Sequence, residues 1–344
     1  MSAALEGVLV LDFTTLLPGP LATQLLAQAG ARVVKVERPG GGDEQRVTGP
    51  SYRDSSAYFA VLNEGKELLA VDLKSGDRSQ LDDLVRTCDV LVEQFRPGVM
   101  KRLGLGEEDV RRVNPSVVYC SITGYGQDGP LAATAGHDLN YLAASGVLSL
   151  TEEPTLPPVL IADLAGAALP AVIDISLALL RRARTGEGSL LDVAMARNLF
   201  ALLPYQIARG FLTGKWPQPG DDTVTGASPR YRVYEASDGR HVAVAPLEDR
   251  FWARFCELAG LSQESTVAEV AARIAAEPSG YWAQLLEDED TCSNVVRTMD
   301  ESVRHPQFAA LFEQSLHPGA PIPRLPLPHG GVAAAPIVRE KESS

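Results

Sequence analysis

The chain has 344 residues, 45% hydrophobic and 22% charged, which is enough for two domains and is typical of a globular protein. Its net charge of −13 argues against a general nucleic-acid or anionic-membrane partner, because both require a positive field. The four cysteines, Cys88, Cys120, Cys256 and Cys292, are scattered singly without metal-ligand spacing. We therefore expect reduced thiols, a cytoplasmic location and no segment that reaches the length of a membrane span.

The first half of the chain alternates short apolar runs with amphipathic segments. The expected strands are 7–13, 32–36, 67–73, 89–93 and 116–122, and the expected helices are 21–29, 79–86 and 107–113. Pro20 suits the first position of a helix, and Ser79 is a plausible N-cap. This alternation predicts a parallel sheet, in which ligands bind at the carboxyl ends of the strands. We therefore expect a ligand site bordered by residues 12–20, 37–42, 93–98 and 123–129.

The second half of the chain changes character. A long apolar helix is expected over 164–182, and a linker or lid rich in Gly, Pro, Thr and Asp over 215–228. A strand, turn and strand at 231–245 and helices at 249–259, 266–277 and 281–286 then indicate a smaller α+β domain. We predict a large domain over residues 1–205, completed by residues 306–344, and a linker with the small domain over residues 206–305. The proline-rich segment 318–336 is expected to be extended.

Several common catalytic signatures are absent from the sequence. It has no G-x-S-x-G elbow, no H-E-x-x-H pair and no Walker loop. The turn after the first strand reads Leu17-Pro-Gly-Pro-Leu21 and lacks G-x-G-x-x-G, which disfavours a dinucleotide oxidoreductase.

Three basic residues follow predicted strands or precede them. Arg38 comes after the second strand, Lys66 immediately before the third, and Arg96 after the fourth. Each taken alone is most simply a solvated surface charge. Together at one edge of the sheet they would clamp phosphates through charge-assisted hydrogen bonds, and both interpretations stay open at this point.

His137, one of five histidines, lies in the segment Gly-His-Asp-Leu-Asn-Tyr that starts at Gly136. Asp138 is expected as the N-cap of a short helix, which would place His137 at its N-terminus and keep the imidazole neutral, as a base requires. Asp163 is most simply another helix N-cap, and Glu248 a residue of a first helical turn. Each of the three is also a candidate for acid–base chemistry.

The motifs of this chain resemble, in order, those of the family III coenzyme A transferases, a superfamily that includes the α-methylacyl-CoA racemases. The motifs are Leu11-Asp-Phe, Pro18-Gly-Pro, Val36-Glu-Arg-Pro39, Val71-Asp-Leu-Lys74, Phe95-Arg-Pro-Gly98, Arg102-Leu-Gly-Leu-Gly106 and Gly124-Tyr-Gly-Gln-Asp-Gly-Pro130. The resemblance covers about residues 6 to 260. It implies a Rossmann-like large domain built from both chain ends, an inserted small domain, and an interlocked homodimer.

The resemblance also implies an acyl-CoA substrate and no cofactor beyond its CoA moiety, with no metal. Arg38, Lys66 and Arg96 match positions that contact CoA in the family, and Tyr141 is assigned to the same binding site. Transferases have Gly-Tyr-Asp where this chain has Gly136-His137-Asp138, and they become acylated on the aspartate that matches Asp163. Racemases have the histidine, pair it with that aspartate, and support it with a glutamate that matches Glu248.

The resemblance therefore favours a racemase that interconverts (2R)- and (2S)-2-methylacyl-CoA through an enolate, with a CoA transferase as the alternative. In the racemase, His137 and Asp163 act on opposite faces of C2, so Asp163 must hold a proton for one enantiomer. A helix N-terminus lowers the pKa of a carboxyl. Burial of Asp163 would have to outweigh that effect.

Overall fold

The protein is described by a computed structural model that covers residues 3–74, 77–151 and 155–325. The chain forms two compact units. The large unit comprises Met1–Ser145, Leu156–Leu203 and Phe312–Ser344, and the small unit comprises Gly146–Thr155 and Pro204–Leu311. The segment 146–155 thus belongs to the small unit, which no feature of the sequence indicated. Most of the predicted proline-rich tail, from residue 326 on, lies outside the described residues.

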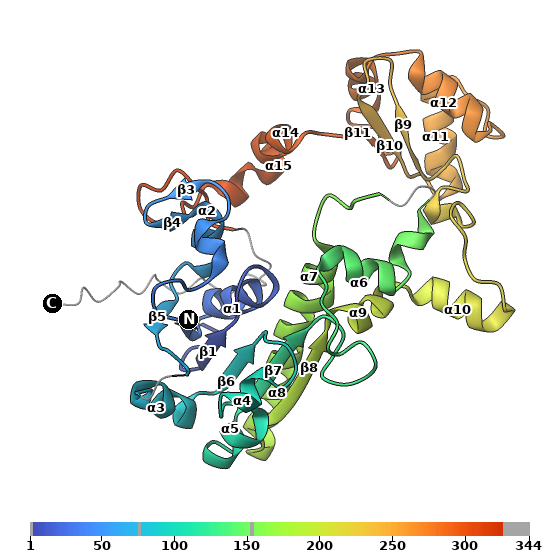
Figure 1. The fold of residues 1–344 in the computed structure, drawn as a ribbon. Helices are drawn as coiled ribbons and strands as arrows, with labels where there is room; N and C mark the ends of the chain where they lie inside the picture. Colours follow the sequence, from blue (N-terminus) through green and yellow to red (C-terminus); the bar gives the residue numbers. More distant parts are fainter. Residues whose placement is uncertain (1–2, 75–76, 152–154, 326–344) are drawn as a thin grey trace. The chain divides into compact units, whose positions relative to one another are not determined.

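The large unit is built around a parallel sheet of six strands (Figure 1). The strands are β1 (Leu9–Phe13), β2 (Arg32–Glu37), β5 (Glu67–Ala70), β6 (Val90–Glu93), β7 (Val118–Thr123) and β8 (Ser189–Ala194). Their order across the sheet is β5-β2-β1-β6-β7-β8. This is the strand order of a Rossmann fold, with the switch point between β1 and β6. The predicted α/β class with a parallel sheet is confirmed.

The sheet is covered by helices on both faces, which is why its central strands are mostly apolar. Every residue of β6 and β7 is buried. Leu11, Leu91 and Tyr119 pack with residues of α3 (Ser79–Thr87), α4 (Val99–Arg102) and α5 (Glu107–Val113). On the other side, α1 (Pro18–Gln28) packs with α8 (Leu169–Thr185), which also contacts β7 and β8.

Three local details differ from the sequence prediction. Helix α1 begins at Pro18, two residues before the expected Pro20, because a proline needs no amide partner in a first turn. Ser79 is the first residue of α3 and donates to Asp77 Oδ1 at 2.9 Å, so it is not the N-cap. The sixth strand, β8, was not predicted as a strand, since its apolar run continues into the following helices.

The sequence pattern predicts no helix or strand over residues 43–63. This stretch holds the short helices η1 (Glu44–Val47) and α2 (Ala57–Asn63) and the two-residue strands β3 (Ser51–Tyr52) and β4 (Ser55–Ser56). The other short elements of the large unit are α6 (Asp138–Ala144), α7 (Ile161–Asp163), η3 (Leu164–Ala168), α9 (Met195–Asn198) and η4 (Leu199–Leu202).

Helices α7, η3 and α8 form one continuous helix, Ile161–Thr185, whose segment η3 is a π-helix. Pro170 has no N–H for the carbonyl of Gly166, four residues earlier, and Asn198 Nδ2 donates to that carbonyl instead at 2.8 Å. A Cβ on Gly166 would lie 2.7 Å from the carbonyl oxygen of Met195, so only glycine fits there. The π-turn therefore follows Asp163 directly, and π-turns are frequent at functional sites.

This helix is 25 residues long and contains an 18-residue stretch with a mean hydropathy of 1.7, so by length and composition it passes the test for a membrane span. The expectation that no segment reaches that length was wrong. Length and composition alone are weak evidence here, because one such helix can also be part of a soluble fold, and this helix packs on β7 and β8.

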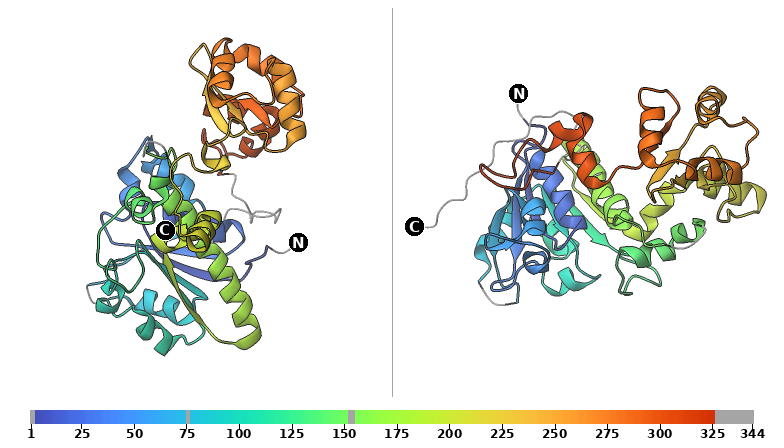
Figure 2. Two further views of the ribbon diagram at one scale, coloured as in Figure 1. Left: turned by 90° about the vertical axis from the view of Figure 1, so that its right-hand side faces the viewer. Right: turned by 90° about the horizontal axis from the view of Figure 1, so that it is seen from above.

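The small unit has an antiparallel sheet of β9 (Arg232–Glu235), β10 (His241–Val244) and β11 (Ser293–Val295), surrounded by α11 (Asp249–Ala259), α12 (Val267–Ala275) and α13 (Ser279–Leu286) (Figure 2). Trp252, Phe255 and Trp282 are fully buried in its core. The remaining elements of this unit are η2 (Val147–Leu150), α10 (Pro204–Thr213), η5 (Thr223–Thr225), α14 (Met299–Arg304), α15 (Pro306–Ala309) and η6 (Ala310–Phe312). The predicted hairpin at 231–245 is confirmed as β9 and β10.

Candidate active site

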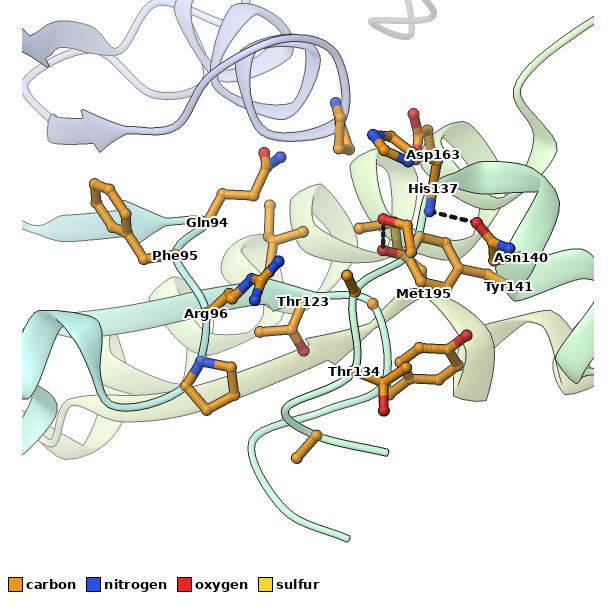
Figure 3. Close-up of a pocket in the computed structure, with 18 of the residues that line it drawn as sticks. Gln94, Phe95, Arg96, Thr123, Thr134, His137, Asn140, Tyr141, Asp163 and Met195 are labelled. Carbon is orange, nitrogen blue, oxygen red and sulfur yellow. Dashed lines mark hydrogen bonds between the residues drawn. The ribbon is translucent and has the colours of Figure 1, made fainter. Parts of the chain in front are cut away.

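A pocket of about 420 Å³ opens in the large unit at the carboxyl edge of the sheet (Figure 3). Its walls come from the loops after β1, β6 and β7, from α6 and the loop before it, and from α7 and α9. The lining residues are Leu16, Pro18, Gln94, Phe95, Arg96, Pro97, Ile122, Thr123, Gly124, Tyr125, Ala132, Thr134, Ala135, Gly136, His137, Asn140, Tyr141, Asp163 and Met195. Three of the four predicted loops therefore border it, and the loop at 37–42 does not.

The loop after β1 has a strained backbone. Leu16 has φ of +63°, which is costly for a residue with a branched side chain. Its N–H donates to Asp43 Oδ1 at 3.0 Å, and the N–H of Gly19 donates to Gln94 Oε1 at 3.0 Å. A Cβ on Gly19 would lie 2.3 Å from that of Thr14, so this turn requires glycine. Hydrogen bonds to the chain after β2 and to the chain after β6 thus hold the strained loop in place.

His137 lies at the N-terminus of α6 as its N-cap, with its backbone N–H donating to Asn140 Oδ1 at 3.0 Å. The expectation that Asp138 would cap the helix was wrong. Asp138 is the first helical residue and is only 5% exposed, and its Oδ1 accepts the backbone N–H of Asp163 at 3.0 Å. The carboxyl is turned away from the amides of its own helix and towards α7.

Tyr141 packs tightly against the two glycine segments of the pocket. A Cβ on Gly124 would lie 2.4 Å from the Tyr141 ring, and one on Gly136 would lie 2.8 Å from it. The Tyr141 hydroxyl donates to the carbonyl of Gly136 at 2.6 Å, and its ring makes an edge contact with Tyr125. Burial, followed by the charge of Asp163, raises the pKa of Tyr141 to about 12. The phenol is thus a neutral group that fixes the loop before His137.

Asp163 is the third residue of α7, so it is not the N-cap that the simpler interpretation required. Burial is the largest cause that raises the pKa of Asp163 to about 6, the charge of Asp138 adds to it, and His137 opposes it. The condition that burial must outweigh the helix terminus is met. Figure 3 shows the Asp163 carboxyl beside the His137 ring at one wall of the pocket. The structure thus brings together an imidazole and a carboxyl whose pKa is raised.

Glu248 belongs to the small unit, where it is the exposed N-cap of α11. The predicted position in the first helical turn was one residue off. Its support of His137 stays a prediction.

The three predicted CoA-binding cations differ in their surroundings. Arg96 is exposed and lines the pocket beside Gln94 and Pro97. Arg38 is also exposed, donates to the carbonyl of Gly41 at 3.0 Å, and does not line the pocket. Lys66 is not the solvated charge that it would be in isolation, because its side chain is fully buried.

Lys66 lies in a buried cluster that we define as Asp12, Lys35, Asp43 and Lys66. Its ammonium is within 3.0 Å of four acceptors, namely Asp12 Oδ2, Pro20 O, Thr23 Oγ1 and Asn63 Oδ1. An ammonium has three protons, so Lys66 keeps none for a phosphate in this arrangement. Lys35 pairs in the same way with Asp43 Oδ2 at 3.0 Å, with both side chains fully buried.

The charges of the buried cluster act on each other. Burial works against ionisation of Asp12, but Lys66 and then Lys35 and two threonine hydroxyls lower its pKa to about 2. Burial lowers the pKa of Lys66 to about 8, against the attraction of Asp12. Each charge is therefore stable only because its partner is there.

Sequence reasoning missed several residues of the site. Gln94 and Leu16 had no signal beyond their place after predicted strands, and Asn140 was passed over although it lies in the same motif as His137. The described part of the chain holds no group of three or more His, Cys, Asp or Glu side chains that could bind a metal ion.

The strand order of the sheet and the pocket at its carboxyl edge define an α/β fold of the kind that binds ligands at the switch point. The sequence matches CoA-transferase family III over residues 5–329, and the chain belongs to that family. It is 33% identical to acetyl-CoA:oxalate CoA-transferase of Acetobacter aceti, over 89% of this chain and 84% of that protein. It is 35% identical to α-methylacyl-CoA racemase of Homo sapiens, over 88% and 80%.

The fold agrees with a solved structure of the same kind. A CAIB/BAIF family protein from Brucella suis superposes with a TM-score of 0.84 at 28% identity, covering 99% of this chain and 97% of that one. The protein is thus an enzyme that acts on acyl-CoA thioesters, in a family that uses no prosthetic cofactor. The relatives are divided between racemases and CoA transferases at similar identity.

Proposed function

We propose that the protein is a racemase of 2-methylacyl-CoA thioesters, which interconverts the (2R) and (2S) forms by proton transfer at C2. The observation that carries this proposal is the pairing of His137 and Asp163 in one pocket, with the pKa of Asp163 raised by burial to about 6. A 1,1-proton transfer needs one group that removes a proton and one that returns it. The pair supplies both from the loop before α6 and from α7.

In the proposed reaction, His137 removes the C2 proton of one enantiomer and becomes an imidazolium, while the thioester carbonyl takes up the electrons as an enolate. Protonated Asp163 then returns a proton to C2 on the opposite face, and the roles reverse for the other enantiomer. Glu248 is assigned to support His137. Arg96, with Arg38, is assigned to the phosphates of CoA.

Lys66 and Tyr141 keep a place in the binding site in this proposal, but their described contacts support an indirect one. Lys66 holds the chain around Asp12 and Pro20, and Tyr141 holds the carbonyl of Gly136. Both would then shape the pocket that receives the substrate.

A CoA transferase is the second candidate, favoured by the similarity to acetyl-CoA:oxalate CoA-transferase. In that reaction the Asp163 carboxylate attacks the thioester carbonyl and CoA leaves as a thiolate, which gives an acylated aspartate. The CoA thiolate then attacks the aspartyl carbonyl of this mixed anhydride, which releases the donor acid as a carboxylate and leaves Asp163 as a CoA thioester. The acceptor carboxylate displaces CoA from that thioester, and the thiolate then takes the acceptor acyl group and frees the Asp163 carboxylate. A carboxyl with a pKa of about 6 is largely ionised at neutral pH, which suits a nucleophile.

Incubation of a single enantiomer of a 2-methylacyl-CoA in D2O, with no acyl acceptor, separates the two candidates. The racemase incorporates deuterium at C2 while optical purity is lost. Absence of exchange, together with acceptor-dependent CoA transfer and trapping of Asp163 by hydroxylamine, would establish the transferase instead.

An interlocked homodimer is part of the proposal and has support on α8. Leu169, Ile173, Leu177 and Leu180 recur along one face of this helix and are 41%, 57%, 60% and 58% exposed. An apolar stripe of this size on a free surface is a common mark of an interface. A second copy would cover it, and Ile173→Lys with Leu177→Lys should then give a smaller species in light scattering.

A cytoplasmic location is also part of the proposal. All four cysteines are free thiols, and Cys88, Cys120 and Cys256 are buried. Free thiols are the usual state in a reducing compartment.

A further inference from the structure

The carboxyl of Asp138 links the two halves of the candidate acid–base pair. Asp138 follows His137 directly in the chain, and its Oδ1 accepts the backbone N–H of Asp163, 25 residues later, at 3.0 Å. The side chain is only 5% exposed. One hydrogen bond thus ties the start of α6 to α7 at the positions that carry His137 and Asp163.

The Asp138 carboxylate makes no hydrogen bond to the amides of its own helix and contributes only its charge to the first turn. The N–H of His137 donates to Asn140, and Asp138 is the first helical residue, so α6 is capped without the Asp138 carboxyl. A structural link alone would be made as well by a neutral asparagine, whose amide oxygen also accepts an N–H. The buried negative charge is therefore an additional feature, and it lies beside a second carboxyl.

Like charges that share a site raise the proton affinity of one of them. After burial, the charge of Asp138 is the next cause that raises the pKa of Asp163, whereas His137 lowers it. The other charged or titratable groups that line this pocket are Tyr141 of α6, Tyr125 after β7 and Arg96 after β6.

We propose that Asp138 is a positioning residue that holds the Asp163 carboxyl in the pocket through the backbone and, by its charge, keeps that carboxyl ready to return a proton. This inference rests on the proposed racemase function and names a second carboxylate on which the acid depends. Asp138 does not touch the reacting atoms and acts only through Asp163.

Two substitutions separate the link from the charge. Asp138→Asn keeps an oxygen that accepts the Asp163 N–H and removes the charge, whereas Asp138→Ala removes both. Asp174→Asn is the matched control, because Asp174 lies on the same continuous helix as Asp163, eleven residues further on, and its pKa is also raised by burial. All three are made in the full-length protein.

The measurement is the titration of Asp163 itself by infrared difference spectroscopy of its carboxyl band, with Asp163→Asn as the subtraction reference. In Asp138→Asn we expect the midpoint to move down by about one pH unit, a tenfold loss of proton affinity. Asp174→Asn should leave it in place. The acid limb of kcat/KM should move with the midpoint, with KM at neutral pH unchanged in Asp138→Asn and altered in Asp138→Ala.

An Asp163 midpoint in Asp138→Asn equal to that of the wild type would overturn the proposal. So would failure of Asp138→Asn to fold by circular dichroism, since the residue would then be structural. The infrared titration requires no turnover, so it is independent of the reaction. If the D2O experiment excludes a racemase but the midpoint still moves, the proposed function fails while the control of Asp163 by Asp138 stands.

Discussion

Two groups of charged residues lie at the carboxyl edge of the same sheet, and they differ in how their charges are balanced. In the buried cluster, Lys35 and Lys66 each have a carboxylate partner at 3.0 Å, and all four side chains are fully enclosed. In the pocket, Asp163 is partly buried next to the exposed His137 and the negative Asp138. The buried cluster has as many cations as carboxylates. In the pocket, the Asp163 carboxyl lies beside a second carboxyl, that of Asp138.

The pKa values express this difference. Asp12 and Asp163 are both buried carboxyls, and burial raises the proton affinity of both. In Asp12 the lysines and hydroxyls reverse that effect and bring the pKa to about 2, whereas in Asp163 no such partner does so and the pKa rises to about 6. Burial with a partner fixes a charge for structure, and burial without one leaves a proton available for chemistry.

The largest effect is expected from breaking the buried cluster. Lys66→Met leaves the buried Asp12 carboxylate without its ion-pair partner, which costs about 3 to 5 kcal/mol of the free energy of unfolding. Urea denaturation at neutral pH measures it. The matched control is Lys101→Met, since Lys101 and Glu108 form a pair 3.6 Å apart with both side chains 76% exposed. That exposed pair should contribute about 0 to 1 kcal/mol.

Unchanged stability of Lys66→Met would alter the comparison between the buried cluster and the pocket. If Lys66→Met unfolds at the same urea concentration as the wild type but binds CoA more weakly, Lys66 is a ligand-binding cation as first predicted. The buried cluster would then be a second part of the substrate site.

Replacing His137 or Asp163 should lower catalysis and leave the fold intact. His137→Ala and Asp163→Ala should each lower the racemisation rate about 10²- to 10⁴-fold, which is the usual contribution of a general acid or base. His137→Ala should abolish deuterium exchange at C2 from at least one enantiomer. Unchanged exchange from both enantiomers would remove the histidine from the mechanism, and circular dichroism provides the check on folding.

The fold could be predicted further than the chemistry of its charges. Five strands of the sheet and the pocket loops after β1, β6 and β7 followed from apolar runs that alternate with helical patterns. His137 and Asp163 came from the motif. The buried state of Lys66 could not be predicted, because its acceptors come from the end of β1, the start of α1 and the end of α2, and only the folded chain brings them together.

Asp138 illustrates the same limit at the site. An aspartate before a helical pattern is correctly read as an N-cap in most sequences. The partner of the Asp138 carboxyl in the structure, the N–H of Asp163, is distant in the chain. No local sequence pattern shows whether the carboxyl accepts from that N–H or from an N–H of its own helix. The sixth strand was missed for a related reason, since residues 190–203 are mostly apolar and a buried strand and a buried helix share that pattern.

The two carboxyls should change stability in opposite directions with pH. Asp12 has a lowered pKa, so its contribution is present above its unfolded value of 3.8 and is lost as pH falls through about 2. Asp163 has a raised pKa, so the folded state holds its proton longer and stability decreases as pH rises from 3.8 through about 6.

Asp163→Asn should therefore stabilise the protein at pH 8, by about 1 kcal/mol in urea, while it removes activity. The gain should shrink as the pH is lowered towards 4, where wild-type Asp163 is protonated. An Asn variant less stable than the wild type at pH 8 would show that the Asp163 carboxylate has a stabilising partner, and the contrast with Asp12 would disappear.

The smallest effect is expected at Tyr141, where a hydrogen bond between two uncharged groups holds the loop before His137. Tyr141→Phe removes the 2.6 Å bond to the carbonyl of Gly136 and keeps the ring that fills the space beside Gly124. The loss in the free energy of unfolding should be about 1 kcal/mol or less, because the carbonyl is not fully enclosed and water can replace the hydroxyl. Tyr58→Phe, at a tyrosine that is 49% exposed on α2, is the control for a lost surface hydroxyl.

The kinetics of Tyr141→Phe test how strongly catalysis depends on this hydroxyl. Because the hydroxyl positions the loop before His137 rather than a reacting group, kcat/KM should fall only a few-fold, about 1 kcal/mol in the barrier. A loss of more than a hundredfold would place the phenol itself among the groups that touch the substrate. The pocket would then depend on its neutral groups as strictly as the buried cluster depends on its charges.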